Sequence, residues 1–285
     1  MFLTVSLNPP PLGSLPPKPL RSAVLHDLRA KIARIEHGAA ATRPNSTLPL
    51  GVAAIDQALP AGGLRLGALH ETVGAGPDTE YGAAATLFIA GLLARLPGPV
   101  LWVLRQADLF APGLAGVGLH PDRVIFAEAG KDVLPAMEEG LRHAGLAAVV
   151  GEVAGRLTLI ASRRLQLAAE QSGVLAMVLR RSQGFDDPVL AEPTAAITRW
   201  RVVSLPSPPA LPHAPSIPGL ATPDLGTPRL GTPGLGRARW RLELTRCRGG
   251  EPGSWIVEAC DATGHLALVA DIRHGSVAQA ERRSA

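Results

Sequence analysis

An alternation of apolar runs and helical segments between residues 68 and 179 is the feature that most limits how this chain can fold. The apolar runs are typical of strands buried on both faces of a sheet. They are Ala68 to Val73, Val100 to Leu104, Val124 to Ala127, Ala147 to Val153 and Val174 to Leu179. Helical segments lie between them, at Ala83 to Leu96, Val133 to Ala144 and Thr158 to Gln171. The alternation predicts an α/β sandwich with a mainly parallel sheet and right-handed crossovers.

The C-terminal part of the chain has the pattern of an antiparallel meander. After a further strand at Ala196 to Ser204, the segment Arg237 to Leu244 alternates apolar and charged residues, as in a half-buried strand. Turns rich in glycine then separate it from strands at Trp255 to Cys260 and Leu266 to Ile272. We expect this meander to extend the main sheet at one edge.

Composition divides the chain into six segments of different character. The core and the meander are separated by a stretch so rich in proline and glycine that it cannot bury enough apolar surface to order itself. The predicted organisation is a disordered N-terminus at 1–20, an amphipathic helix and linker at 21–45, the core at 46–204, a flexible Pro/Gly-rich insertion at 205–236, the meander at 237–274 and a tail at 275–285.

Several features bear on partners and compartment. Leu25, Leu28, Ile32 and Ile35 form an apolar stripe on a helix that carries basic residues on its other faces, so it either docks a partner or nucleic acid or packs on the domain. The first twenty residues have neither a basic n-region nor a long apolar run, which argues against a signal peptide or a membrane span. The two cysteines are too few for a disulfide framework, so we expect reduced thiols and a cytoplasmic protein.

The segment between the first predicted strand and helix stands where a phosphate-binding loop is expected. A functional loop reads G-x-x-x-x-G-K-[ST], in which backbone N–H groups surround the phosphates, the lysine neutralises them and the hydroxyl holds Mg²⁺. This chain has Gly74, Ala75, Gly76, Pro77, Asp78, Thr79, Glu80 and Tyr81. Glu80 replaces the lysine, Thr79 the second glycine and Tyr81 the hydroxyl residue, while Pro77 removes one N–H donor. A triphosphate would meet a carboxylate here, so the loop is predicted to be degenerate.

The residues leading into this loop resemble the entry to the ATPase core of RecA-like recombinases. They include Leu50-Gly51, Gly62-Gly63-Leu64 and Leu66 to Glu71. The resemblance implies a P-loop NTPase type, three-layer sandwich and locates two further catalytic positions by counting. The catalytic glutamate position falls on Ala107 and the Mg²⁺-side aspartate position on Gly151, with Asp108 and Glu152 next to them. We therefore expect no catalytic residue, no nucleotide or other cofactor and no metal site.

Arginines supply nearly all of the positive charge and gather in two places. The first is Arg163-Arg164 in the third predicted helix, and the second is the meander. The meander residues are Arg237, Arg239, Arg241, Arg246 and Arg248. As a hypothesis, both groups contact a partner or a DNA backbone. The alternative for the meander is a solvated edge that guards against aggregation.

The recombinase-like core, the degenerate loop and the Arg-rich meander together resemble the bacterial ImuA family, over roughly residues 21 to 275. The most specific parts are Leu50 to Glu71, Gly145 to Glu170 and Arg239 to Asp261. The resemblance implies a non-catalytic accessory protein of SOS-induced, error-prone translesion synthesis. Its implied partners are ImuB, an inactive Y-family polymerase relative, RecA and, indirectly, an error-prone polymerase III alpha-type subunit.

Two other functions stay open at this point. The first is a divergent ATPase that uses Asp108 or Glu152 with an unusual loop. Glu80 argues against it, because a carboxylate a few ångströms from a triphosphate is strongly unfavourable. The second is a division inhibitor similar to SulA, for which the chain is long and the Arg-rich meander has no role.

Overall fold

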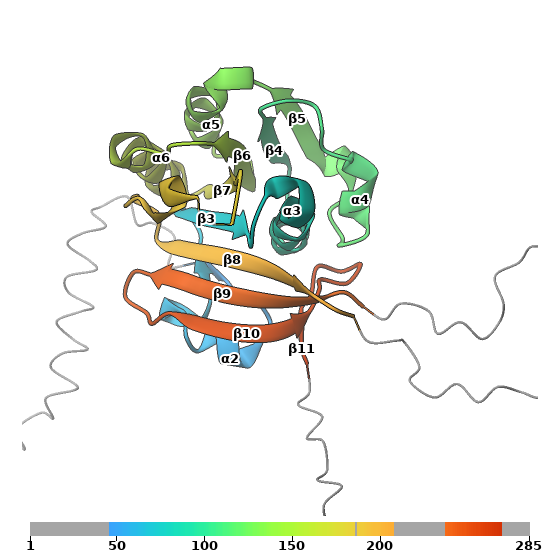
Figure 1. Ribbon diagram of the computed structural model, residues 1–285. Coiled ribbons are helices and arrows are strands. Elements are labelled where there is room, and N and C mark those ends of the chain that lie inside the picture. The colour runs from blue at the N-terminus through green and yellow to red at the C-terminus, as the bar shows by residue number, and fades with distance from the viewer. Residues whose placement is uncertain (1–45, 186, 208–236, 270–285) are drawn as a thin grey trace, which may run out of the picture. The chain divides into compact units, whose positions relative to one another are not determined.

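The strands of the described residues form one nine-stranded sheet and a separate two-stranded one (Figure 1). The computed structural model describes residues 46–185, 187–207 and 237–269. The predictions for 1–45, for most of the insertion (208–236) and for the tail lie outside these residues. The strand order of the large sheet is β11-β10-β9-β8-β3-β7-β6-β4-β5. Its strands are β3 (Leu69–Gly74), β4 (Val100–Leu104), β5 (Val124–Glu128), β6 (Ala148–Ala154), β7 (Leu175–Arg181), β8 (Thr198–Leu205), β9 (Arg239–Cys247), β10 (Gly253–Glu258) and β11 (Ala267–Leu268).

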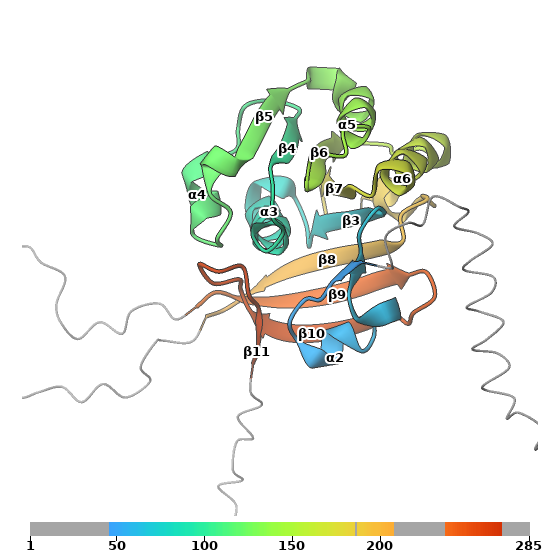
Figure 2. The ribbon, with the colours of Figure 1, turned by 180° about the vertical axis from the view of Figure 1, so that it is seen from behind.

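The large sheet is parallel from β5 to β8 and antiparallel from β8 to β11, which confirms the predicted fold class. Strand β8 joins the two halves, because it pairs with β3 in parallel and with β9 antiparallel. The small sheet pairs β1 (Thr47–Leu48) with β2 (Leu64–Arg65). In the sequence, the one-turn helix α2 (Ala53–Asp56) lies between these two strands, and Figure 2 shows it next to the meander. The third strand of the meander is shorter than predicted, and Ile272 lies outside the described residues.

Helices cover both faces of the parallel half. Helix α3 (Asp78–Ala94) packs on one face, while α5 (Val133–Leu141) and α6 (Leu159–Ser172) pack on the other. The short helix α4 (Ala111–Ala115) follows β4 on the α3 side. None of the described helices combines the length and apolarity that a membrane span requires.

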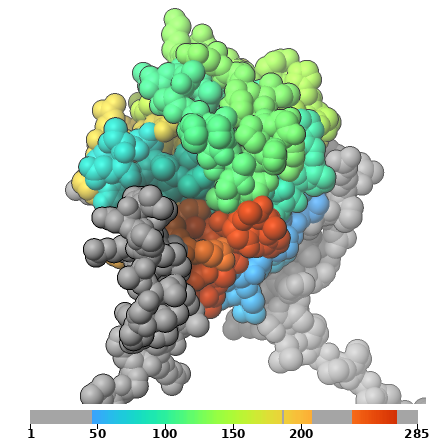
Figure 3. All heavy atoms as spheres, turned by 90° about the vertical axis from the view of Figure 1, so that its right-hand side faces the viewer, coloured from blue at the N-terminus to red at the C-terminus, as the bar shows by residue number. Residues whose placement is uncertain are grey.

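Helix α3 is apolar nearly all round because protein surrounds it. On the sheet side, the Phe88 ring lies 5.8 Å from that of Trp200 and 6.5 Å from that of Trp240. On another side of α3, a Cβ added at Gly91 would lie 2.3 Å from the sulfur of Cys260. The segment from Cys260 to the turn at Gly264 therefore packs directly against the helix. Figure 3 shows this C-terminal segment, in red, against the green residues around α4. The meander therefore completes the core that the parallel strands begin.

The start of α3 differs from the prediction, and the difference matters for the loop. The helix was predicted to begin at Ala83, where the apolar residues start, but it begins at Asp78. Pro77 occupies the N-cap position, with fixed φ favouring the start of a helix immediately after it. Asp78 to Tyr81 are therefore already helical, and the connection from β3 is only three residues long.

A buried histidine joins β3 to β8 at the boundary between the two halves of the sheet. The Trp200 indole N–H donates to Thr198 Oγ1 at 3.0 Å, and Thr198 Oγ1 lies 2.7 Å from His70 Nδ1. His70 Nε2 lies 2.9 Å from the carbonyl oxygen of Arg65. These partners fit a neutral imidazole that donates from Nε2 and accepts at Nδ1. Burial lowers the pKa of His70 to about 4.

This pKa makes stability depend on pH. Because the folded-state pKa is depressed, the unfolded chain binds the proton first as the pH falls from 6.5 towards 4. We expect the free energy of unfolding to fall by about 2 to 3 kcal/mol between pH 7.5 and 4.5 from this group alone. Urea unfolding of the wild type and of His70→Gln at both pH values measures the difference. Equal pH slopes for the two proteins would contradict the assignment.

Candidate functional site

The loop between β3 and α3 uses its own backbone donors. The N–H of Asp78 donates to the carbonyl of Ser182 at 2.9 Å, which ties the start of α3 to the segment after β7. The N–H groups of Glu80 and Tyr81 both donate to the carbonyl of Pro77 at 3.0 Å. Pro77 itself has no N–H. The N–H groups of Asp78, Glu80 and Tyr81, which a functional loop would direct at phosphates, are therefore bonded within this protein.

The N-terminus of α3 also carries negative charge. Asp78 and Glu80 both lie in its first turn, and Glu80, at the lysine position, is exposed. Carboxylates at this end of a helix interact favourably with its macrodipole, which otherwise attracts a phosphate. The charge that a nucleotide would supply is thus already present in the protein.

Arg181, at the end of β7, lies among three carboxylates from distant parts of the chain. Its Nη1 is 2.5 Å from Asp78 Oδ2 at the start of α3, and its Nη2 is 2.5 Å from Glu152 Oε2 on β6. Its Nη2 is also 3.3 Å from Asp108 Oδ1, in the segment after β4. Its Nε makes a second hydrogen bond to Glu152, at 3.1 Å. We call Arg181 and these three carboxylates the Arg181 cluster.

The central ion pair of the Arg181 cluster lies inside the protein. The side chain of Glu152 is 1% exposed and accepts a further hydrogen bond from the indole of Trp102 at 3.0 Å. Burial raises the pKa of Glu152, although Arg181 and Trp102 oppose the shift. Burial acts to lower the pKa of Arg181, but the hydrogen bonds and charges of Glu152 and Asp78 outweigh it and raise that pKa. Arg181 is therefore a permanent cation held by the protein at the base of the loop.

An aromatic side chain covers the loop. The rings of Tyr81 and Phe185 meet edge to face, with centroids 5.6 Å apart. A Cβ added at Gly76 would lie 2.6 Å from the Phe185 ring, so this ring rests against the Gly76 backbone. Phe185 is nevertheless 61% exposed. Phe185 covers the side of Gly76 on which another residue would carry its side chain.

The two positions counted as lost catalytic residues lie apart. Ala107 is exposed in the segment after β4, next to Asp108. Gly151 lies in β6 with its α-carbon against Met137 of α5, on the sheet face opposite α3. Glu152, the next residue, points to the α3 face. Asp108 and Glu152, either of which a divergent ATPase was expected to use, are both bound to Arg181.

Sequence reasoning did not identify Arg181 or Phe185. The only local signal was a pair of arginines, Arg180 and Arg181, at the end of a buried apolar strand. Their side chains point to opposite faces of the sheet. Arg180 is on the face that α6 covers, where it lies 3.5 Å from Glu71, and both of these side chains are almost fully buried. Within the described residues no group of His, Cys, Asp and Glu is arranged to hold a metal ion.

The arginines predicted to contact a partner or DNA do not lie together in the structure, and several of them bind other groups of this protein. Arg237 pairs with Glu258 at 3.3 Å, and Arg246 donates to the carbonyl of Thr194 at 2.8 Å. Arg241 lies 3.8 Å from Glu243. Arg239 shares the outer face of β9 with Arg241, and Arg248 is exposed in the turn that follows. The meander thus presents a face of mixed charge.

The arginines of α6 are more accessible. Arg163 and Arg164 are both exposed, on the face of the helix that points away from the sheet. Arg164 pairs across the helix interface with Glu138 of α5 at 2.7 Å. These residues lie on the opposite side of the sheet from α3 and the Arg181 cluster.

Comparison with known proteins shows a clear sequence similarity. Protein ImuA from two strains of Caulobacter vibrioides is 41% identical to this chain over 252 residues, which cover 84% of this chain and 95% of that protein. No protein-family model matches the chain. Among solved structures, the RadB recombinase superposes with a TM-score of 0.50 at 17% identity, over 78% of this chain and 100% of that one. The last likeness shows a RecA-like fold.

Proposed function

The chain belongs to the ImuA family, and from this premise we propose that it is a non-catalytic, RecA-like accessory factor of SOS-induced, error-prone translesion synthesis. It acts in the cytoplasm by binding an ImuB-like inactive Y-family polymerase and RecA, and through them it reaches an error-prone polymerase III alpha-type subunit. Contact with DNA is a secondary part of the proposal, assigned to the outer arginines of α6 and β9.

The observation that carries this proposal is the Arg181 cluster. A nucleotide-hydrolysing core of this fold needs a loop lysine, free loop N–H groups and an available carboxylate for Mg²⁺. Here the cation at the loop is Arg181, and its carboxylate partners are Asp78, Asp108 and Glu152. The cluster holds one guanidinium and three carboxylates, so its cation is fully used inside the protein and the remaining formal charge is negative, which disfavours a triphosphate. A core of this kind serves as a binding scaffold.

Calorimetric titration of Mg-ATP and Mg-ADP into the purified full-length protein tests the first half of the proposal. We expect no binding heat at millimolar nucleotide and no turnover, with RecA from the same organism as the positive control. Micromolar affinity accompanied by hydrolysis would overturn the non-catalytic assignment. The partner half is tested by size-exclusion chromatography of the protein mixed with purified ImuB-like polymerase or RecA at moderate salt, where co-elution is expected.

A further inference from the structure

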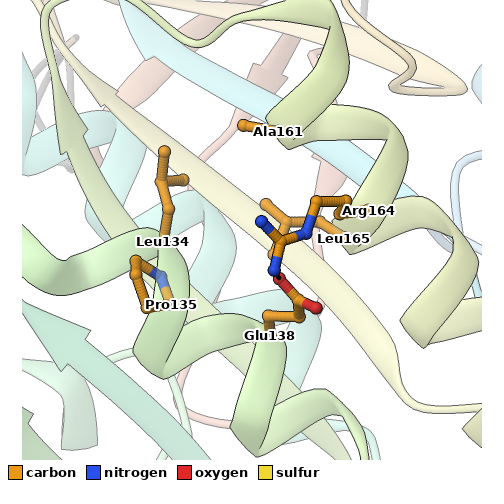
Figure 4. A pocket seen from close by; sticks show the side chains of 6 residues that line it. All are labelled: Leu134, Pro135, Glu138, Ala161, Arg164 and Leu165. Carbon is orange, nitrogen blue, oxygen red and sulfur yellow. Dashed lines mark ion pairs between the residues drawn. The ribbon is translucent and has the colours of Figure 1, made fainter.

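A surface hollow lies between helices α5 and α6, on the opposite side of the sheet from the Arg181 cluster. The hollow has a volume of about 230 Å³. Its lining residues are Leu134, Pro135 and Glu138 of α5 and Ala161, Arg164 and Leu165 of α6 (Figure 4). Since a cavity of roughly 150 Å³ accommodates a benzene ring, one large apolar side chain fits here.

Apolar side chains continue from the hollow onto the outer surface of α6. Ile160 is 78% exposed and Leu167 is 44% exposed. They are seven residues apart in the helix and lie on the same side as Arg164, which stands between them. Single exposed apolar residues are common on protein surfaces, but a stripe beside an apolar hollow is typical of a binding site. We call the hollow together with Ile160, Arg163, Arg164 and Leu167 the α5–α6 face.

The charges of this face favour an acidic occupant. Glu138 is bound twice, by Arg164 at 2.7 Å and by Arg142 at 3.0 Å, and Arg142 also lies 3.3 Å from Glu139. Arg163 makes no ion pair with any described residue. Guanidinium groups therefore outnumber carboxylates on the α5–α6 face. The first turn of α6 contains no acidic residue to balance them.

We propose that the α5–α6 face binds a segment of the ImuB-like partner that carries one large apolar side chain flanked by carboxylates. The apolar side chain enters the hollow against Leu134 and Leu165, while Ile160 and Leu167 contact the rest of the segment. The flanking carboxylates pair with Arg163 and Arg164, which fixes the register of the segment. Arg164 can turn to the partner because Arg142 still neutralises Glu138. The inference rests on the proposed function, since it names the surface through which that function acts.

Binding of purified ImuB-like partner to surface variants of the full-length protein tests the inference. Ile160→Asp and Arg163→Glu change exposed side chains without intramolecular contacts to lose, so both variants keep the fold, as circular dichroism and unchanged urea midpoints verify. We expect each to weaken binding at least tenfold, and wild-type affinity to fall as salt is raised. The matched controls are Ile256→Asp and Arg105→Glu, which make the same changes at exposed positions of β10 and the segment after β4.

Overlapping 20-residue peptides of the partner then identify the segment. We expect binding only by peptides in which Asp or Glu flanks a Leu, Ile, Met, Phe or Trp. Wild-type affinity in both Ile160→Asp and Arg163→Glu would overturn the inference and leave the proposed function standing. If the wild-type protein itself does not bind the partner, the proposed partner is wrong and the inference falls with it.

Discussion

Replacement of Arg181 by alanine is expected to lower the free energy of unfolding by about 3 to 5 kcal/mol near pH 7. The substitution removes the cation that neutralises Glu152, which is buried between Trp102 and the loop. A buried carboxylate without a partner is much more costly than a lost surface ion pair. Urea unfolding followed by tryptophan fluorescence and circular dichroism measures the change.

Controls for this prediction separate the buried charge from the loss of side-chain volume. Arg105→Ala, at an exposed position, should change stability by less than about 0.5 kcal/mol. Adding Glu152→Gln to Arg181→Ala should restore part of the loss, because the uncompensated charge is gone. In Arg181→Ala alone the deficit should shrink from pH 7 to pH 5. The pKa of Glu152 is raised in the folded state, so its protonation stabilises the fold as the pH falls. A loss that is small and independent of pH would show that the cluster is not a buried ion pair.

Strands β3, β4, β6 and β7 were predictable because they are buried on both faces. Such a strand is a continuous apolar run, and Val100 to Leu104 was located to the residue. The prediction of burial on both faces was wrong for β5, which forms the edge of the sheet and has Ile125 and Phe126 exposed. Helices α5 and α6 were located to within one residue at their starts. The start of α3 was predicted at Ala83 instead of Asp78, because the residues after Pro77 were interpreted as part of a phosphate-binding loop. Their polar character is equally compatible with the first turn of a helix.

Some residues of the candidate site are neighbours in the sequence, whereas others are far apart in it. Glu80 and Pro77 could be recognised as unsuited to phosphate because the loop motif is a short contiguous pattern. Arg181 could not, because Asp78, Asp108 and Glu152 come from three segments that only the sheet brings together. The meander arginines illustrate the same limit. Alternation predicts which of them point outward, whereas the partners of Arg237 and Arg246 belong to other strands and loops.

Gly151→Asp, which places an aspartate at the position counted as lost, is expected to prevent stable folding rather than to restore a metal ligand. A Cβ at this position would lie 1.9 Å from the sulfur of Met137 and 2.5 Å from its Cγ. Gly151 is also buried in the middle of β6, with β4 and β7 on either side. Steric overlap and a buried carboxylate without a cation act together, so we expect a loss of more than about 4 kcal/mol. Soluble yield and thermal unfolding report it.

Smaller substitutions at the same position test whether the close approach of α5 is the cause. Gly151→Ala should cost about 1 to 3 kcal/mol, and adding Met137→Ala should make the further cost of that alanine close to zero in a double-mutant cycle. Gly145→Ala, with no atom near its added Cβ, is the matched control. If Gly151→Asp folded as stably as the wild type, α5 would not be seated on this strand as described. If the variant fails to fold stably, the glycine is required because β6 packs closely against Met137 of α5 at this position. The carboxylate of β6, Glu152, is on the α3 side and bound to Arg181.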